Sequence, residues 1–190
     1  MAPDRDGVEG VLTLILRHVP ETEVRLVGTA SSVLRGIDIP AGDIDLLFRD
    51  RAGVDAWFAA LSAELEVDAA PDWLAEQRQY FARIRAGDVA VELSTVEIEV
   101  DNDTAECLGS GPWEHYDVVS CRDGVVPAVA TELRLITEIA RAREDRYGPI
   151  IDFLRDNGCD IDLVRRGLAN LGASQDGVER VVARLSSPSS

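Results

Sequence analysis

The stretch VRLVGTASSVLRGIDIPAGDIDLLFRD, residues 24–50, decides the fold of this chain. It begins and ends with β-prone runs, and the second run, Asp43–Phe48, carries Asp43 and Asp45. Because side chains alternate between the two faces of a strand, these two carboxylates are expected to point the same way. Neighbouring carboxylates repel each other unless a cation lies between them, and hard oxygen ligands suit Mg²⁺ or Mn²⁺. The stretch therefore predicts a divalent-metal site on its second strand.

The first half of the same stretch is suited to phosphate. Gly28-Thr29 follows the first β-prone run and opens a predicted helix that continues through Ser32 to Arg35. Glycine lets the backbone approach a ligand closely, and the free N–H groups at a helix start favour an anion. The Thr29 hydroxyl adds one more donor. We therefore expect Gly28, Thr29 and Ser32 to bind phosphate groups.

Gly28-Thr29 followed by Asp43-Ile-Asp45 between apolar residues resembles the signature of the nucleotidyltransferase superfamily, which has the DNA polymerase β-like fold. The usual form begins with Gly-Ser or Gly-Gly, so Thr29 departs from it while keeping the hydroxyl. The resemblance extends to about Leu93 and, by size, is to small antibiotic-modifying or minimal members. It implies that the two aspartates bind divalent metal on an incoming nucleotide, helped by a third carboxylate from a later strand.

Glu92 is the candidate for this third carboxylate. It lies in the predicted strand VAVELST, the second arm of a hairpin that turns at Gly87-Asp88. An acid within an otherwise apolar strand needs a partner, because burying a lone charge is costly, and a metal would supply one. The resemblance also implies a carboxylate on a strand in this position. Glu97 and Glu99 are the alternatives, and they also fit the solvated side of an edge strand.

Residues 126–132, together with residues 140–146, resemble the part of small nucleotidyltransferases that follows the catalytic sheet. There, a strand containing proline leads into a helix that ends in Arg-x-Lys-Asp-Arg. In this chain Glu144 stands where lysine is usual, which weakens phosphate binding at that residue. Arg141, Arg143 and Arg146 are candidates to contact a triphosphate, and we expect Arg143 to do so. The alternative is that they form salt bridges on a helix surface.

The composition bounds the class of protein. The chain has 190 residues, of which 46% are hydrophobic, enough for one medium domain or a domain with a small appendage. No apolar run approaches the roughly 20 residues that a membrane span needs, and the acidic start lacks the apolar segment of a signal peptide. Cys107, Cys121 and Cys159 form no CxxC pair and are interpreted as free thiols. These features favour a cytoplasmic protein without membrane association.

The charge is strongly negative and bears on the partners. The net charge is −16, from 35 acidic and 19 basic residues, and every basic residue is arginine. Binding to a nucleic-acid backbone requires a basic surface, so we do not expect long nucleic acid as a partner. A negative field attracts cationic small molecules or a basic protein. We therefore expect an NTP and a small-molecule acceptor as partners, with a protein partner as the alternative.

The expected fold class is α/β (α+β), with a nucleotidyltransferase-like mixed sheet flanked by helices. This core is expected over residues 1–127, followed by a helical region over 128–186 and a disordered tail over 187–190. Strands are predicted over 22–27, 43–48, 66–70, 79–86, 89–95 and a late hairpin within 116–126. Helices are predicted over 8–18, 30–35, 54–65, 128–143, 147–157, 160–171 and 175–185, with a helical turn within 71–77.

The expected function is metal-dependent nucleotidyl transfer. The chain would move an NMP from an NTP, with Mg²⁺ or Mn²⁺, to a hydroxyl of a small and cationic acceptor, using Asp43, Asp45 and Glu92. One alternative is a transferase of the toxin–antitoxin type that acts on a protein or tRNA. Another is a nucleotide-binding or interaction module whose catalytic residues have decayed, which the departures at Thr29 and Glu92 would favour.

Overall fold

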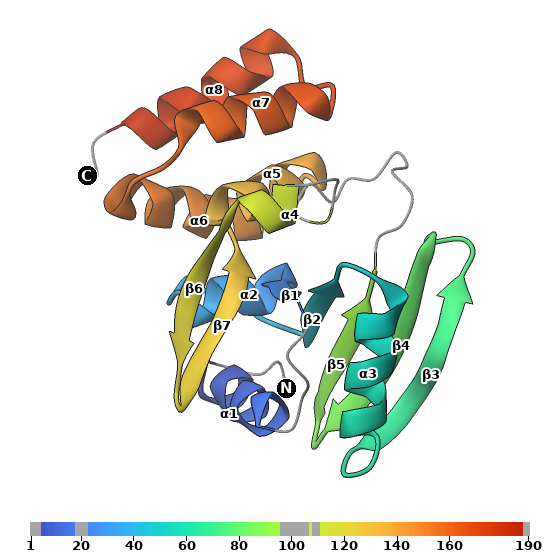
Figure 1. Ribbon diagram of the computed structural model, residues 1–190. Helices are drawn as coiled ribbons and strands as arrows, with labels where there is room; N and C mark the ends of the chain where they lie inside the picture. Colours follow the sequence, from blue (N-terminus) through green and yellow to red (C-terminus); the bar gives the residue numbers. More distant parts are fainter. Residues whose placement is uncertain (1–4, 18–22, 96–106, 108–110, 188–190) are drawn as a thin grey trace.

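The computed structural model describes residues 5–17, 23–95, 107 and 111–187. Within these residues the chain forms one mixed sheet, flanking helices and a group of C-terminal helices (Figure 1). The strands are β1 (Val24–Val27), β2 (Asp43–Phe48), β3 (Glu66–Leu74), β4 (Gln79–Ala86), β5 (Val89–Ser94), β6 (Tyr116–Cys121) and β7 (Gly124–Val129). The helices are α1 (Arg5–Leu16), α2 (Gly28–Leu34), α3 (Arg51–Leu61), α4 (Gly111–Glu114), α5 (Thr131–Ala140), α6 (Glu144–Asn157), α7 (Ile161–Asn170) and α8 (Gln175–Ser186).

The sheet has seven strands in the order β3-β4-β5-β2-β1-β7-β6. β2 runs parallel to β5 and antiparallel to β1, whereas β1 runs parallel to β7. The carboxyl ends of β1 and β7 therefore meet at one end of the sheet. Val27, the last residue of β1, pairs there with Asp45 of β2. This topology confirms the predicted fold class, a mixed α/β sheet followed by helices.

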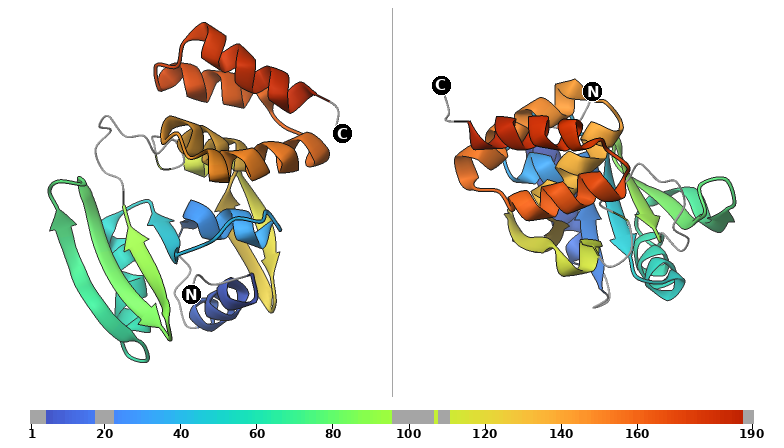
Figure 2. Two further views of the ribbon diagram at one scale, coloured as in Figure 1. Left: turned by 180° about the vertical axis from the view of Figure 1, so that it is seen from behind. Right: turned by 90° about the horizontal axis from the view of Figure 1, so that it is seen from above.

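The C-terminal helices lie over the end of the sheet that carries Val27 and Asp45. β7 ends there at Val129 and leads directly into α5. Seen from above, α5–α8 cover the β1, β6 and β7 side and leave β3 and β4 uncovered, with α7 and α8 outermost (Figure 2). The buried side chains of these helices join those of the sheet in one continuous cluster. None of the helices formed by the described residues has the length and apolar character needed to cross a membrane.

Strand alternation in β2 separates the core from the acidic face. Ile44 and Leu46 are fully buried, whereas Asp43 and Asp45 are half-buried on the other face. Downstream, Phe48 packs edge-to-face on Trp57 of α3, with the ring centroids 5.3 Å apart. The apolar half of β2 thus anchors the strand, and the carboxylates are held by a rigid element.

Three differences from the predicted elements have clear physical causes. β3 continues to Leu74, where a helical turn was predicted within 71–77, because β3 pairs with β4 along its whole length. It is an edge strand with register shifts on either side of Ala69, and such a strand tolerates Pro71. α3 begins at Arg51 because the Asp50 side chain accepts a hydrogen bond from the Gly53 N–H at 2.9 Å.

α5 begins at Thr131 instead of residue 128 because β7 extends to Val129. The remaining predicted strands and helices are present, with ends that differ by a few residues. The boundary predicted between residues 127 and 128 stays a prediction. Glu97, Glu99 and residues 188–190 of the predicted tail lie outside the described residues.

Candidate metal and nucleotide site

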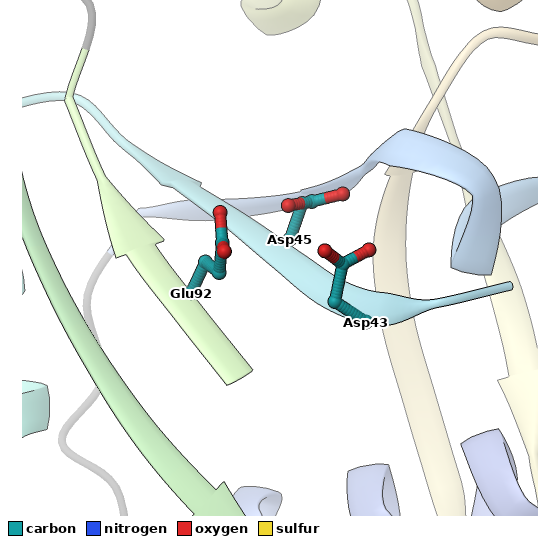
Figure 3. Close-up of side chains that lie close together, drawn as sticks. All are labelled: Asp43, Asp45 and Glu92. Atoms are coloured by element: carbon teal, nitrogen blue, oxygen red, sulfur yellow. The ribbon is translucent and has the colours of Figure 1, made fainter. Parts of the chain in front are cut away.

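Three carboxylates from two neighbouring strands converge on one point. Asp43 and Asp45 lie on β2, and the parallel pairing of β2 with β5 places Glu92 directly opposite Asp45. One oxygen atom from each of the three side chains lies within 4.8 Å of the others, and all three residues are half-buried (Figure 3). The structure thus brings together the three residues that the sequence singled out. Their roles in metal binding and catalysis stay predictions.

This set of donors fits a divalent cation of the hard type. The three side chains offer oxygen ligands only, at a spacing that a single ion can bridge. Without a positive charge between them, three carboxylates at this distance repel one another. The site therefore has both the ligand chemistry and the excess negative charge that Mg²⁺ or Mn²⁺ requires.

Arg83 supplies a positive charge at the edge of this site. It lies on β4 directly opposite Glu92, and its Nη2 donates a hydrogen bond to Glu92 Oε1. This hydrogen bond raises the pKa of the Arg83 guanidinium, and the negative charges of Glu92 and Asp43 add to the effect. Arg83 is not among the residues that the sequence patterns single out. The two-residue turn predicted at Gly87-Asp88 fixes this register and could have identified the pair.

Gly28 leaves room for Asp45. It connects β1 to α2 with a φ of +67°, a left-handed conformation that favours glycine. A Cβ atom built on Gly28 would overlap the Asp45 carboxylate. The absence of a side chain at Gly28 is thus what allows Asp45 to lie against the turn.

The two predicted hydroxyl contacts have different surroundings. Thr29 is 6% exposed, and its Oγ1 accepts a hydrogen bond from Arg146 Nη1 at 3.2 Å. Ser32 is only 1% exposed, and its Oγ has no hydrogen-bond partner among the described residues. The helix that they share, α2, has only seven residues. Because Ser32 is buried, its position does not favour contact with a nucleotide. Because α2 is short, the predicted phosphate contacts of Gly28 and Thr29 depend more on neighbouring groups than on the helix itself.

A cluster of arginines lies around one acidic residue in the C-terminal part of the chain, and one of these arginines contacts Thr29 in the turn after β1. Its centre is Glu138 of α5, which is 0% exposed and forms an ion pair with Arg134 of the same helix. Arg143 and Arg146 each place an Nη1 atom 3.8 Å from a Glu138 carboxylate oxygen. Three guanidinium groups thus surround one buried carboxylate. The structure therefore places Arg143, a predicted nucleotide-binding residue, in a basic cluster.

Arg146 is the member of this cluster that reaches the turn, through its hydrogen bond to Thr29. Thr29 and Arg146 are 117 positions apart in the sequence. From the sequence, Arg146 is only one of three candidate triphosphate contacts, because sequence alone does not predict pairing at this separation.

Comparisons with known proteins support the fold. No protein-family model matches the chain, and no curated protein matches it either. Among solved structures, the chain is similar to a presumed nucleotidyltransferase from Thermotoga maritima. The TM-score is 0.57 at 15% sequence identity, over 82% of this chain and 97% of that one. The fold is therefore nucleotidyltransferase-like.

Proposed function

We propose that this protein is a metal-dependent nucleotidyltransferase that moves an NMP from an NTP to a hydroxyl of a small, cationic acceptor. The observation that carries the proposal is the convergence of Asp43, Asp45 and Glu92 within 4.8 Å, on two parallel strands of a nucleotidyltransferase-like fold. The Gly28 turn and the arginine cluster around Glu138 lie at the same end of the sheet. In this proposal the three carboxylates provide acidic groups for a metal, and the arginine cluster provides basic groups for phosphates.

The chemistry requires one bond to form and one to break. The acceptor oxygen attacks the α-phosphorus, the bond from that phosphorus to its bridging oxygen breaks, and pyrophosphate leaves. A divalent cation, held by Asp43 and Asp45 with Glu92, would neutralise charge on the phosphates and lower the pKa of the acceptor hydroxyl. In the alternative role, Glu92 would accept the hydroxyl proton as a general base.

The basic groups of the chain would bind and orient the triphosphate. Arg143 and Arg146 belong to the basic cluster around Glu138, and Arg146 is hydrogen-bonded to Thr29 beside Gly28. Guanidinium groups bind phosphate oxygens through strong, charge-assisted hydrogen bonds. Positioning of this kind, with stabilisation of charge, provides most of the catalysis in phosphoryl transfer.

The class of acceptor follows from the charge of the molecule. A net charge of −16 attracts cations and repels a nucleic-acid backbone. An aminated small molecule with free hydroxyl groups suits this field. A basic protein is the second candidate, since the same field attracts it.

The experiment is a transfer assay with the full-length chain. Each of the four NTPs, labelled at the α-phosphate, is incubated with Mg²⁺ or Mn²⁺ and a panel of aminated, neutral and protein acceptors. Pyrophosphate release and label transfer are measured together. The expected result is metal-dependent transfer to a cationic acceptor.

Asp43→Asn and Asp45→Asn are expected to abolish transfer without unfolding the protein. Asp88→Asn is the matched control, because Asp88 lies exposed in the turn between β4 and β5, where asparagine is equally suited. Equal turnover in the aspartate variants and the control would refute the assignment. Nucleotide binding without pyrophosphate release would indicate a binding module.

A further inference from the structure

The pair of Arg83 with Glu92 is built into the sheet. The two residues face each other across β4 and β5, in a register that runs without a break from Ala86 and Val89 at the turn. Their side chains form a hydrogen-bonded ion pair. A cross-strand pair of this kind is fixed by the hairpin itself, so Arg83 belongs to the wall of the acidic site.

The charges of the site decide what Arg83 does to a metal. Asp43, Asp45 and Glu92 carry three negative charges, and Arg83 offsets one of them. The remaining two negative charges match a single divalent cation. An ion that binds next to Glu92 is repelled by the guanidinium as long as Arg83 keeps its hydrogen bond to that carboxylate.

The pair is able to open. The Arg83 side chain is 44% exposed and that of Glu92 is 20% exposed. Arg83 Nε is buried and has no hydrogen-bond partner among the described residues. A half-exposed ion pair contributes little to stability, so a doubly charged ion can displace the guanidinium into solvent.

A supporting role would have the opposite effect. Groups that hydrogen-bond to a metal ligand from outside orient that ligand and raise the affinity for the metal. If Arg83 only oriented Glu92, its removal would weaken metal binding. If it competes for Glu92, its removal would strengthen metal binding. The sign of the effect therefore separates the two roles.

We propose that Arg83 is a resident cation of the acidic site, which occupies Glu92 in the metal-free protein and lowers the affinity of the site for a divalent cation. The proposal rests on the metal centre of the proposed function. Its consequence is that the Glu92 side of the site is filled only when an added cation displaces Arg83.

The experiment measures Mn²⁺ binding to the full-length protein by electron paramagnetic resonance, without nucleotide. Arg83→Gln removes the charge and is expected to bind Mn²⁺ about tenfold more tightly than the wild type. Arg83→Lys keeps the charge and is expected to stay within about twofold. Arg85→Gln is the matched control, because Arg85 lies two residues along β4 and pairs with Asp68 at 2.5 Å.

A double mutant isolates the contact. In a Glu92→Gln background, Arg83→Gln is expected to leave Mn²⁺ affinity unchanged, because the carboxylate for which the two cations compete is gone. Mn²⁺ binding by Arg83→Gln that is no tighter than binding by Arg85→Gln would overturn the proposal. Weaker binding would overturn it in favour of the supporting role.

A measurement on the wild type covers the case in which Arg83→Gln does not fold. The ¹⁵Nε–H signal of Arg83, assigned by its loss in Arg83→Lys, is expected to shift on addition of Mg²⁺. A signal that stays in place at saturation would overturn the proposal.

Asp45→Asn separates this inference from the proposed function. If Asp45→Asn loses Mn²⁺ binding while Arg83→Gln binds like the control, only the role of Arg83 fails. If Asp45→Asn binds Mn²⁺ as the wild type does, the metal centre fails, and the inference fails with it.

Discussion

Asp45 packs so closely against Gly28 that any side chain at position 28 would overlap its carboxylate. The contact joins the two halves of the sequence stretch from which the fold was predicted, the turn after β1 and the acidic strand β2. It also means that a glycine expected to make room for phosphate makes room, in this structure, for the carboxylate of Asp45.

Gly28→Ala is expected to displace Asp45 and to weaken Mn²⁺ binding by tenfold or more, in addition to lowering stability by about 1–3 kcal/mol through the positive φ. Gly87→Ala is the matched control. Gly87 has a φ of +62°, but a Cβ atom there meets no heavy atom within 4 Å. Chemical unfolding should show a loss of stability in both variants, and only Gly28→Ala should lose Mn²⁺. Equal Mn²⁺ affinity in the two variants would show that Asp45 does not depend on Gly28.

Arg146→Gln is expected to weaken NTP binding by about tenfold, because it removes a charge-assisted hydrogen bond to phosphate and the charge itself. The measurement is calorimetric titration with a non-hydrolysable NTP analogue. Arg155→Gln is the control on the same helix, where Arg155 pairs with Asp152 at 2.8 Å. A decrease in affinity that is the same in both variants would point to the overall field of the protein and away from a contact at Arg146.

The thiol of Cys159 is expected to make the free energy of unfolding depend on pH in the alkaline range. Burial, with the charges of Glu132 and Asp160 adding to it, raises the pKa of the Cys159 thiol from an ordinary 9.0 to about 12. As the pH rises through this interval, the unfolded chain loses the thiol proton while the folded chain keeps it, so the free energy of unfolding falls. The chain has no lysine, so few other groups titrate there.

Cys159→Ser removes this thiol. Urea unfolding between about pH 9 and 11 is expected to show a steeper loss of stability in the wild type than in Cys159→Ser. Cys121→Ser should differ from the wild type in the same sense, because burial raises the pKa of Cys121 as well. If the free energy of unfolding changed with pH in the same way for the wild type and Cys159→Ser, the raised pKa of the Cys159 thiol would be contradicted.

Most of the fold could be predicted from local patterns. β2 has the predicted bounds, Asp43–Phe48, because alternation of apolar and acidic residues is a strong strand signal. The length of β3 could not be predicted, since Pro71 reads as the start of a turn until the pairing with β4 is known. Tertiary pairing decides such edge strands, whatever their local propensity.

The candidate site divides in the same way. Asp43, Asp45 and Glu92 follow from strand positions and from the resemblance, and the structure places them together. Arg83 follows only from the register of a hairpin, and the contact of Arg146 with Thr29 follows only from the docking of the C-terminal helices. Local sequence patterns thus single out the acidic residues, whereas the contacts that Arg83 and Arg146 make require the tertiary structure.

The hydrogen bond from Arg146 to Thr29 spans two parts of the chain, the C-terminal helices and the turn after β1. If the same guanidinium contacts the triphosphate, nucleotide binding and the docking of these helices are thermodynamically linked, and each strengthens the other by the same factor. Removing the C-terminal helices would then take away part of the nucleotide site, and a saturating nucleotide would protect their amide hydrogens from exchange.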